Sequence, residues 1–433
     1  MNYTVKAGAR SGAADIPSSK SYAHRMLICA ALACSKSVLS CNGISRDIKA
    51  TIDCLNALGA KIELGSDNEL DVTPIGLKCS KLAESHECTS EKAEKITLFC
   101  NESGSTLRFV LPIACALGGH FVFDMAEGLA ARPMDALIDV LEAHGVTIIK
   151  EKNRIIAEGK LNSGTYSIAG NISSQYISGL LMALPLLEGD SKLIITGNVE
   201  SRDYISITES CIKNAGIDFN VSGNEYFIPG NQKYDVNERD FVEKDWSGAA
   251  FFLCMGALSS KGVVIDGMNV NSAQGDREIL HVLENFGAEV NIEDQGSNCR
   301  IMIKKGCLTG QTIDASEIPD LVPTIAAVAS LAKGTTNIVN AARLRYKESD
   351  RLKTTSDMLK SIGADVTELE DSLVIVGKSS LDGGHVDSHN DHRIAMAAAV
   401  AACGCKNEVT VEGSECVNKS FPAFWECLER MDI

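Results

Sequence analysis

The sequence repeats one pattern six times at an interval of roughly 72 residues, and this repeat restricts the fold more than any other feature. Each copy contains an apolar, alanine-rich segment that begins with polar residues. This pattern indicates a buried helix whose N-terminus stays accessible. The six helices are predicted to begin near Ser21, Ser105, Ser174, Ser247, Asp320 and His392.

A second series of helices alternates with the first. These segments are amphipathic, and five of them end in a glycine that leads directly into a short strand, as in NALGAKIEL and ENFGAEVNI. A glycine just after a helix typically takes a positive φ. The five glycines are Gly59, Gly145, Gly216, Gly287 and Gly363. The unit is therefore helix, strand, amphipathic helix, strand, which predicts an α/β protein with two pseudo-threefold domains of three units each.

Two polar segments interrupt the pattern. GNQKYDVNERD, residues 230–240, falls near the middle of the 433 residues and is predicted to link the two domains. SKLAESHECTSEKAEK, residues 80–95, lengthens the first interval and is predicted to be an exposed insertion.

Composition excludes several classes of protein. A formal net charge of −16 argues against a general nucleic-acid binder. The longest uncharged apolar run, Phe109–Phe123, is too short for a bilayer, and the first twenty residues lack the apolar core of a signal peptide. Sixteen cysteines are scattered, many of them in apolar segments, which indicates a reduced cytoplasm.

Two short motifs could bind a metal. Cys403 and Cys405 are a single pair of thiols without a second pair. In HVDSHNDH, a strand would place four ligand-type side chains on one face. These are His385, Asp387, His389 and Asp391. Neither motif is accompanied by a complementary ligand set, so we expect no metal site.

Polar and charged residues collect at the predicted helix starts. Free N–H groups and the helix dipole favour anions there, although a single such start is usually only an N-cap. The first series supplies Lys20, Ser21, Arg25, Ser105, Arg108, Ser173, Ser174, Gln175, Asp391 and Arg393. The second series supplies Arg132, Ser201, Arg202, Tyr204, Lys347, Glu348 and Arg351, and Lys419 follows near the C-terminus. So many cations at equivalent positions predict one cleft for ligands with several negative charges.

Two acids beside these cations are candidates for proton transfer. Asp320 opens an apolar helix in IPDLVPT, and Glu348 lies between Lys347 and Arg351. Carboxylates in such surroundings can act as general acid or base. For each acid alone, helix capping or ion pairing explains the position equally well. The sequence contains no serine-nucleophile elbow, no Walker loop and no dinucleotide-binding GxGxxG before a suitable helix.

Eight segments, taken in order, resemble the EPSP synthase (3-phosphoshikimate 1-carboxyvinyltransferase) family over essentially the full chain. They are PSSKSYAHR, SGSTLRF, ARPMD, GNISSQYISGLLMALP, IPDLVPT, YKESDRL, NDHRIAM and NKSFP. The resemblance implies an inside-out α/β barrel that occurs twice, with the N-terminal strand in the C-terminal half. The implied domains are residues 1–17 with 238–433, and residues 18–237.

The resemblance also implies a reaction. The enolpyruvyl group of phosphoenolpyruvate passes to the 5-hydroxyl of shikimate 3-phosphate, with release of phosphate. No metal or organic cofactor is required, and we expect a cytoplasmic monomer without nucleic-acid or membrane partners. In this family glyphosate binds at the donor site, against the glycine that matches Gly104. Glu102 stands where many relatives have asparagine.

The family pattern assigns roles to individual residues. For shikimate 3-phosphate the matching residues are Lys20, Ser21, Arg25, Ser173, Ser174, Gln175, Ser201, Tyr204, Asp320, Asn340 and Lys347. For phosphoenolpyruvate they are Lys20, Gly104, Ser105, Arg132, Gln175, Arg351, Asp391, Arg393 and Lys419. Asp320 and Glu348 are expected to transfer the protons, with Lys20 assisting.

Two alternative functions fit some of these residues. UDP-N-acetylglucosamine enolpyruvyltransferases share the fold and the donor, but they carry a reactive cysteine five residues before the arginine that matches Arg132. Glu127 occupies that position here, and Ser21 follows Lys20 where those enzymes have asparagine. A non-catalytic anion-binding or RNA-binding module is disfavoured by the net charge and by the two acids.

Overall fold

The computed structural model describes residues 1–66, 68–77, 95–293 and 298–433, and it divides the chain into two compact units. Unit 1 consists of Met1–Ser19 and Glu243–Ile433, and unit 2 consists of Lys20–Val242. The predicted insertion at residues 80–95 lies almost entirely outside the described residues. No helix in the described ranges is long and apolar enough to cross a membrane.

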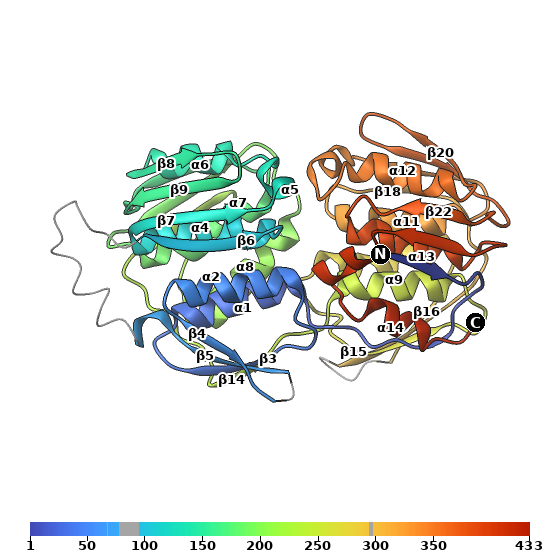
Figure 1. Ribbon diagram of the computed structural model, residues 1–433, viewed down its shortest axis with the longest axis horizontal. Coiled ribbons are helices and arrows are strands. Elements are labelled where there is room, and N and C mark those ends of the chain that lie inside the picture. Colours follow the sequence, from blue (N-terminus) through green and yellow to red (C-terminus); the bar gives the residue numbers. More distant parts are fainter. Residues whose placement is uncertain (67, 78–94, 294–297) are drawn as a thin grey trace. The chain divides into compact units, whose positions relative to one another are not determined.

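Helices and strands alternate through unit 2 (Figure 1). The elements are α1 (Lys20–Leu32), β3 (Ser37–Ser40), α2 (Arg46–Ala57), β4 (Lys61–Leu64), β5 (Glu69–Thr73), η1 (Ile75–Leu77), β6 (Ile96–Asn101), α4 (Gly104–Leu117), β7 (Gly119–Met125), α5 (Glu127–Ala130), α6 (Asp135–Glu142), β8 (Val146–Lys150), β9 (Arg154–Gly159), β10 (Thr165–Ala169), α7 (Ser174–Ala183), η3 (Leu184–Leu186), β11 (Ser191–Thr196), α8 (Arg202–Asn214), β12 (Asn220–Ser222), β13 (Glu225–Ile228) and β14 (Arg239–Phe241).

Unit 1 follows the same alternation after two N-terminal strands. Its elements are β1 (Asn2–Val5), β2 (Gly12–Ala13), α9 (Trp246–Ala257), β15 (Val263–Met268), η4 (Gly275–Glu278), α10 (Ile279–Phe286), β16 (Glu289–Glu293), β17 (Cys299–Lys304), β18 (Thr312–Asp314), η5 (Pro319–Leu321), α11 (Val322–Ala329), β19 (Thr335–Val339), η6 (Ala342–Tyr346), α12 (Arg351–Ser361), β20 (Asp365–Glu368), β21 (Leu373–Val376), β22 (Gly384–Asp387), α13 (His392–Ala402), β23 (Val409–Glu412), η7 (Ser414–Lys419) and α14 (Phe424–Glu429).

The described part of each unit contains three sheets, so the six predicted repeats correspond to six sheets. Unit 2 has the strand orders β14-β3-β5-β4, β6-β7-β9-β8 and β10-β11-β13-β12. Unit 1 has β2-β15-β17-β16, β18-β19-β21-β20 and β1-β23-β22. In all five four-stranded sheets a parallel pair is extended by an antiparallel hairpin. The predicted two-domain α/β class is confirmed.

Strands from distant parts of the sequence complete both units. β1 pairs antiparallel with β23, with Asn2 opposite Glu412, which confirms that the N-terminal strand joins the C-terminal half (Figure 1). β2 extends the same unit by pairing in parallel with β15. In unit 2, β14 returns from the end of the unit to pair in parallel with β3, the first strand.

Residues 230–240, which were predicted to link the two domains, belong instead to unit 2. Tyr234 is completely buried in unit 2, and its hydroxyl donates a hydrogen bond to the carbonyl of Met182 at 2.6 Å. Arg239–Phe241 forms β14. The chain passes between the units a few residues later, at Val242 and Glu243.

The first helix series forms the core, as its composition predicts. Every residue of α11 and α13 is buried, and so is every residue of α9 except Ser247. A helix that is apolar on all sides is stable only inside the protein. These three helices contact one another in unit 1. Their N-termini therefore have fixed positions, because the helix bodies cannot shift without disturbing the core.

The amphipathic helices of the second series end at glycines, as predicted. All five glycines have positive φ: Gly59 at 107°, Gly145 at 99°, Gly216 at 76°, Gly287 at 99° and Gly363 at 90°. At Gly287 a side chain would face an additional obstacle, since a Cβ would lie 2.5 Å from the carbonyl oxygen of Cys307. Gly334 has a similar φ of 96° but no atom within 4 Å of such a Cβ.

Gly287→Ala is expected to destabilise unit 1 more than Gly334→Ala does. Both variants bear the strain of a left-handed residue, roughly 1–2 kcal/mol, but only the first also displaces backbone. Denaturant unfolding followed by tryptophan fluorescence measures the difference, because both tryptophans, Trp246 and Trp425, belong to unit 1. Equal losses in the two variants would show that the contact with Cys307 has no effect on stability.

Candidate functional site

The predicted site residues form two sets, one in each unit, and each set lies mainly at helix N-termini. In unit 2 they lie at or near the starts of α1, α4, α7 and α8. In unit 1 they lie at η5, at the junction of η6 with α12, at the start of α13 and at the end of η7. The helix bodies are core and the helix starts carry the polar groups.

The start of α4 brings two guanidinium groups to one glycine. A Cβ at Gly104 would lie 2.9 Å from Nη1 of Arg132 and 3.2 Å from Nη1 of Arg108. Glycine therefore allows both cations to approach the first turn of the helix, where free N–H groups also favour an anion. We call Gly104, Ser105, Arg108 and Arg132 the α4 anion site.

Gln175 connects this site to α7. Its Oε1 accepts a hydrogen bond from Nη1 of Arg108 at 2.6 Å, and its Nε2 donates one to Oγ of Ser105 at 2.8 Å. Four residues predicted for phosphoenolpyruvate are thereby brought together. They are Gly104, Ser105, Arg132 and Gln175. Glu102 is half-buried just before the N-cap residue, Ser103.

Arg25 is a buried cation that no carboxylate among the described residues neutralises. Its guanidinium donates to Oγ1 of Thr208 at 2.6 Å, to the carbonyl of Ser21 at 2.7 Å, to the carbonyl of Tyr204 at 2.9 Å and to Oγ of Ser178 at 3.2 Å. Burial lowers the pKa of Arg25 to about 10. Four of its five N–H groups are thus used inside unit 2, which leaves one for a ligand.

Serine hydroxyls surround the starts of α7 and α8. Ser173 caps α7 by accepting from the N–H of Gln175 at 3.3 Å, and Ser174 is buried beside it. Ser201 precedes α8 in a left-handed conformation with φ of 52°, unusual for a residue with a side chain, and it makes no side-chain cap hydrogen bond. Such strain is concentrated at functional sites. At the start of α1, Lys20 pairs with Asp47 at 3.0 Å.

The unit 1 set is a dense network of ion pairs around Arg351, which is 1% exposed. Nε of Arg351 lies 2.9 Å from Asp391, Nη1 lies 2.9 Å from Asp320, and Nη2 donates to Glu348. Asp320 also lies 2.9 Å from Arg393 and 3.3 Å from Lys347. The six residues form the Arg351 cluster: Asp320, Lys347, Glu348, Arg351, Asp391 and Arg393.

The cluster fixes the charges of its members. Burial alone would raise the pKa of Asp320, but Arg393, Lys347 and Arg351 outweigh it and hold this pKa well below its usual range. Burial lowers the pKa of Lys347, and Asp320 opposes that change. Burial would also raise the pKa of Asp391, but Arg351 keeps it low. Asp320 and Asp391 are therefore carboxylates that balance the buried cations.

Two other predicted residues have partners outside this cluster. Asn340 is exposed, has a left-handed φ of 57° and donates from Nδ2 to Asp314 at 2.8 Å. Lys419 is buried, and its Nζ donates to the carbonyl of Asn390 at 2.7 Å.

The motif HVDSHNDH does not form a single strand, so its four ligand-type side chains do not share one face of a strand. β22 ends at Asp387, and His389 and Asn390 both have left-handed φ values, 50° and 56°. Asp391 then caps α13 by accepting from the N–H of Arg393 at 2.9 Å. Within the described ranges no group of three or more histidine, cysteine or acidic side chains could hold a metal ion.

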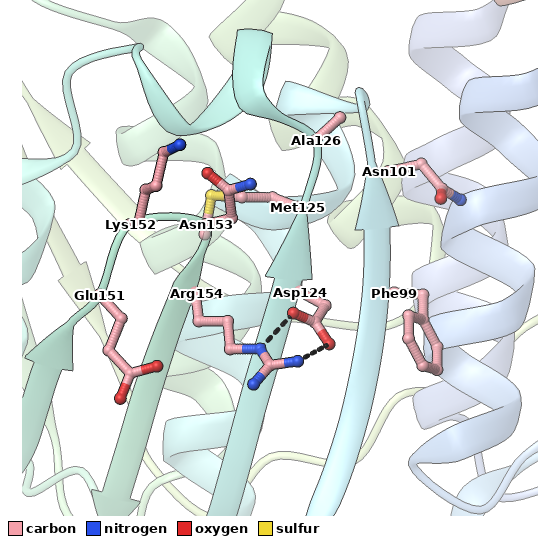
Figure 2. Close-up of a pocket in the computed structure, with 9 residues that line it drawn as sticks. All are labelled: Phe99, Asn101, Asp124, Met125, Ala126, Glu151, Lys152, Asn153 and Arg154. Atoms are coloured by element: carbon pink, nitrogen blue, oxygen red, sulfur yellow. Dashed lines mark hydrogen bonds and ion pairs between the residues drawn. The ribbon is translucent and has the colours of Figure 1, made fainter.

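A pocket of about 560 Å³ lies elsewhere in unit 2, near the ends of β6 and β7 and the start of β9 (Figure 2). Figure 2 shows Arg154 and Asp124 paired side by side on the neighbouring strands β9 and β7, and Nε of Arg154 lies 2.6 Å from Oδ1 of Asp124. The pocket contains none of the predicted site residues. Its lining consists of Phe99, Asn101, Asp124, Met125, Ala126, Glu151, Lys152, Asn153 and Arg154.

Asp276, whose pKa depends on two members of the Arg351 cluster, was not predicted from the sequence. It lies in η4, is 4% exposed, and accepts a hydrogen bond from Oγ of Ser247 at the start of α9. Burial raises its pKa to about 6, with Arg393 opposing and Asp320 adding to the shift. A single aspartate in a turn has no spacing signal. The one signal in the sequence was that α9 begins at a position equivalent to the starts of the other core helices, so polar residues near it were candidates for the site.

Known proteins resemble the chain over nearly its full length. The family model for EPSP synthase (3-phosphoshikimate 1-carboxyvinyltransferase) matches residues 6–428. Proteins named 3-phosphoshikimate 1-carboxyvinyltransferase from Clostridium kluyveri and Clostridium acetobutylicum are each 42% identical, over 96% and 97% of this chain and 93% and 95% of theirs. The solved EPSP synthase of Acinetobacter baumannii matches with a TM-score of 0.80 and 26% identity, covering 99% of this chain and 98% of that one.

Asp276→Asn is expected to gain stability relative to the wild type as the pH rises. The native pKa near 6 lies above the ordinary value of 3.8, so ionisation costs the native state stability between these values, and the full cost applies above pH 6. Asparagine cannot ionise, so the difference should grow by up to about 3 kcal/mol from pH 4 to pH 7.

Tryptophan-monitored unfolding at several pH values measures this difference in unit 1. Asp365→Asn, at an exposed position in β20, is the matched control. A stability difference for Asp276→Asn that does not vary with pH would contradict the assignment of a raised pKa.

Proposed function

The chain belongs to the EPSP synthase family, and we infer that it is a 3-phosphoshikimate 1-carboxyvinyltransferase in which residues of both units act in one reaction. The enzyme transfers the enolpyruvyl group of phosphoenolpyruvate to the 5-hydroxyl of shikimate 3-phosphate and releases phosphate. Both substrates carry a carboxylate and a phosphate, so binding sites for them must be locally cationic. The supporting observation is that buried or half-buried cations gather at the predicted positions in a protein of net charge −16.

We propose that the acceptor binds to the unit 2 set together with residues of unit 1. Hydroxyls and free N–H groups at the starts of α7 and α8 suit the 3-phosphate. The remaining N–H of Arg25 suits the carboxylate, and Ser201 lies directly before α8 with the left-handed φ described above. The proposed contacts are Lys20, Ser21, Arg25, Ser173, Ser174, Gln175, Ser201, Tyr204, Asp320, Asn340 and Lys347.

The donor is proposed to bind the α4 anion site and the cations of the Arg351 cluster. Arginine forks hold carboxylate and phosphate oxygens in a defined orientation. Gly104 is needed because any side chain there would displace Arg132. The proposed contacts are Lys20, Gly104, Ser105, Arg132, Gln175, Arg351, Asp391, Arg393 and Lys419.

Asp320 and Glu348 are the proposed proton-transfer groups. The 5-hydroxyl loses a proton as its oxygen bonds to C2 of the donor, and C3 gains a proton, which gives a tetrahedral adduct. C3 then loses a proton, the C2–O bond to phosphate breaks, and the double bond forms again. Lys20 is proposed to assist, and the arginines offset charge on the leaving phosphate.

The ion pairs of the cluster connect binding to basicity. Three cations lower the pKa of Asp320 in the ligand-free protein, which makes it a weak base. Substrate phosphate and carboxylate oxygens compete for the same cations. We propose that this competition frees Asp320 to accept a proton after the substrates bind, since a carboxylate that loses cationic neighbours becomes more basic.

The further proposal is that the protein acts as a monomer in the cytoplasm, without nucleic acid. The fourteen cysteines within the described ranges are free thiols, and most are buried, which suits a reducing compartment.

The acceptor identifies the activity. Phosphate release from phosphoenolpyruvate should require shikimate 3-phosphate and should not occur with UDP-N-acetylglucosamine. A coupled phosphate assay with each acceptor measures this. Turnover with the UDP-sugar alone would overturn the assignment, and salt-dependent RNA binding without phosphate release would indicate a binding module.

Glu348→Gln is expected to lower kcat by about 10²–10⁴-fold while KM for each substrate changes much less, because glutamine keeps the shape but cannot transfer a proton. Steady-state kinetics with both substrates varied separates the two effects. Glu289→Gln, at an exposed position in β16, is the matched control. Proportional changes in kcat and KM would instead assign Glu348 to holding Arg351.

A further inference from the structure

Four buried side chains of unit 2 form a continuous hydrogen-bonded chain that ends at the α4 anion site. Nδ1 of His24 lies 2.7 Å from Oγ1 of Thr51, which lies 2.7 Å from Oγ1 of Thr106. The hydroxyl of Thr106 lies 2.7 Å from Oγ of Ser103, the N-cap residue of α4. The chain connects α1, α2 and α4, and each member is at most 1% exposed.

The shorter contacts give one direction for these hydrogen bonds, since the Thr106 hydroxyl lies 2.7 Å from Oγ of Ser103 and 3.4 Å from its other acceptor, the carbonyl of Asp47. Oγ of Ser103 accepts from the N–H of Thr106 at 3.2 Å and from the Thr106 hydroxyl. The Thr106 oxygen is then available to accept from Thr51, and Thr51 to accept from Nδ1–H of His24. Nε2 of His24 has no hydrogen-bond partner. In this tautomer Nε2 is an unpaired acceptor rather than an unpaired buried donor, which is the less costly arrangement.

His24 is suited to be the fixed end of this chain. Burial, Lys20 and Arg25 hold its pKa well below the usual range, so the ring stays neutral and keeps one N–H. Its ring meets Phe109 of α4 edge to face, with centroids 6.3 Å apart. A packed ring with a single N–H can hold the Thr51 hydroxyl in one orientation.

We propose that His24 is a positioning residue for the donor. Through Thr51 and Thr106 it fixes the Ser103 cap, and thereby the backbone of Gly104 and Ser105 that faces Arg132. This inference rests on the proposed function, because it assumes that the α4 anion site receives phosphoenolpyruvate. A small rotation of the first turn would move its N–H groups away from the anion, and donor binding depends steeply on such geometry.

Thr51→Val and Thr106→Val break the chain with side chains of nearly the same shape. Each should raise KM for phosphoenolpyruvate about 5- to 20-fold, with KM for shikimate 3-phosphate unchanged and kcat within about twofold, an effect equivalent to about one lost hydrogen bond between neutral groups. The double variant should match the single variants, because one break already disconnects the chain.

Substitutions at His24 test its part directly. His24→Asn keeps an N–H donor near the position of Nδ1 and should retain a donor KM close to the wild type. His24→Leu removes the donor and should behave like Thr51→Val. Thr336→Val, which removes a completely buried threonine hydroxyl of unit 1 that has no hydrogen-bond partner, is the control for the Thr-to-Val exchange itself.

The outcomes separate this proposal from the proposed function. Absence of turnover in the wild type with shikimate 3-phosphate would refute the function itself. An active wild type with an unchanged donor KM in Thr51→Val and Thr106→Val would overturn the positioning role. Equal increases in both KM values, or the same change in Thr336→Val, would also overturn it. Should His24→Leu fail to fold, the two valine variants decide the question.

Discussion

Arg351 is the ion around which the polar part of unit 1 is arranged. One buried guanidinium contacts Asp320 at η5, Glu348 before α12 and Asp391 at the cap of α13, so it connects three segments far apart in sequence. Three carboxylates both accept hydrogen bonds from this guanidinium and offset its charge, so the loss of any one of them would leave buried charge uncompensated. The same contacts hold Lys347 and Arg393 near Asp320 and determine the charges that a ligand meets.

The repeat explains why the same helices supply both the core and the candidate site. Each helix of the first series has an apolar body that must be buried and a polar start that supplies free N–H groups. Because three such helices contact one another in unit 1, their starts are fixed by the packing of the core. In unit 2 the chain from His24 to Ser103 adds a hydrogen-bonded connection between helices to this packing.

Periodicity predicted what is local. Spacing and turn chemistry within one repeat predict where the apolar helices begin and which five glycines have positive φ. They also predict the two-domain α/β class. Pairings between distant segments were not readable in this way, because strands such as β2 and β14 are only two and three residues long. Composition misassigned residues 230–240, since it could not show that Tyr234 is buried.

For the candidate site too, the sequence predicted some features, and others depend on tertiary structure. Resemblance to a family located the residues, but the sequence could not show how they contact one another. The pairing of Asn340 with Asp314 depends on tertiary structure, and so does the effect of Arg393 on the pKa of Asp276. A strand that covers His385 to Asp391, the condition for a metal-binding face, does not form because two successive left-handed residues, His389 and Asn390, end the extended chain after β22.

Because the N-terminal strands β1 and β2 belong to unit 1, the two units cannot be completed in the order in which the chain is synthesised. All strands of unit 2 have been made once Val242 is reached, so this unit can close while the remainder is still being translated. Unit 1 begins earlier and finishes later, because β1 pairs with β23, more than 400 residues further along. β1 therefore stays unpaired through nearly the whole of synthesis, whereas β2 can pair once β15 has been made. Cellular protection of nascent strands acts longest on the end of this chain that is made first.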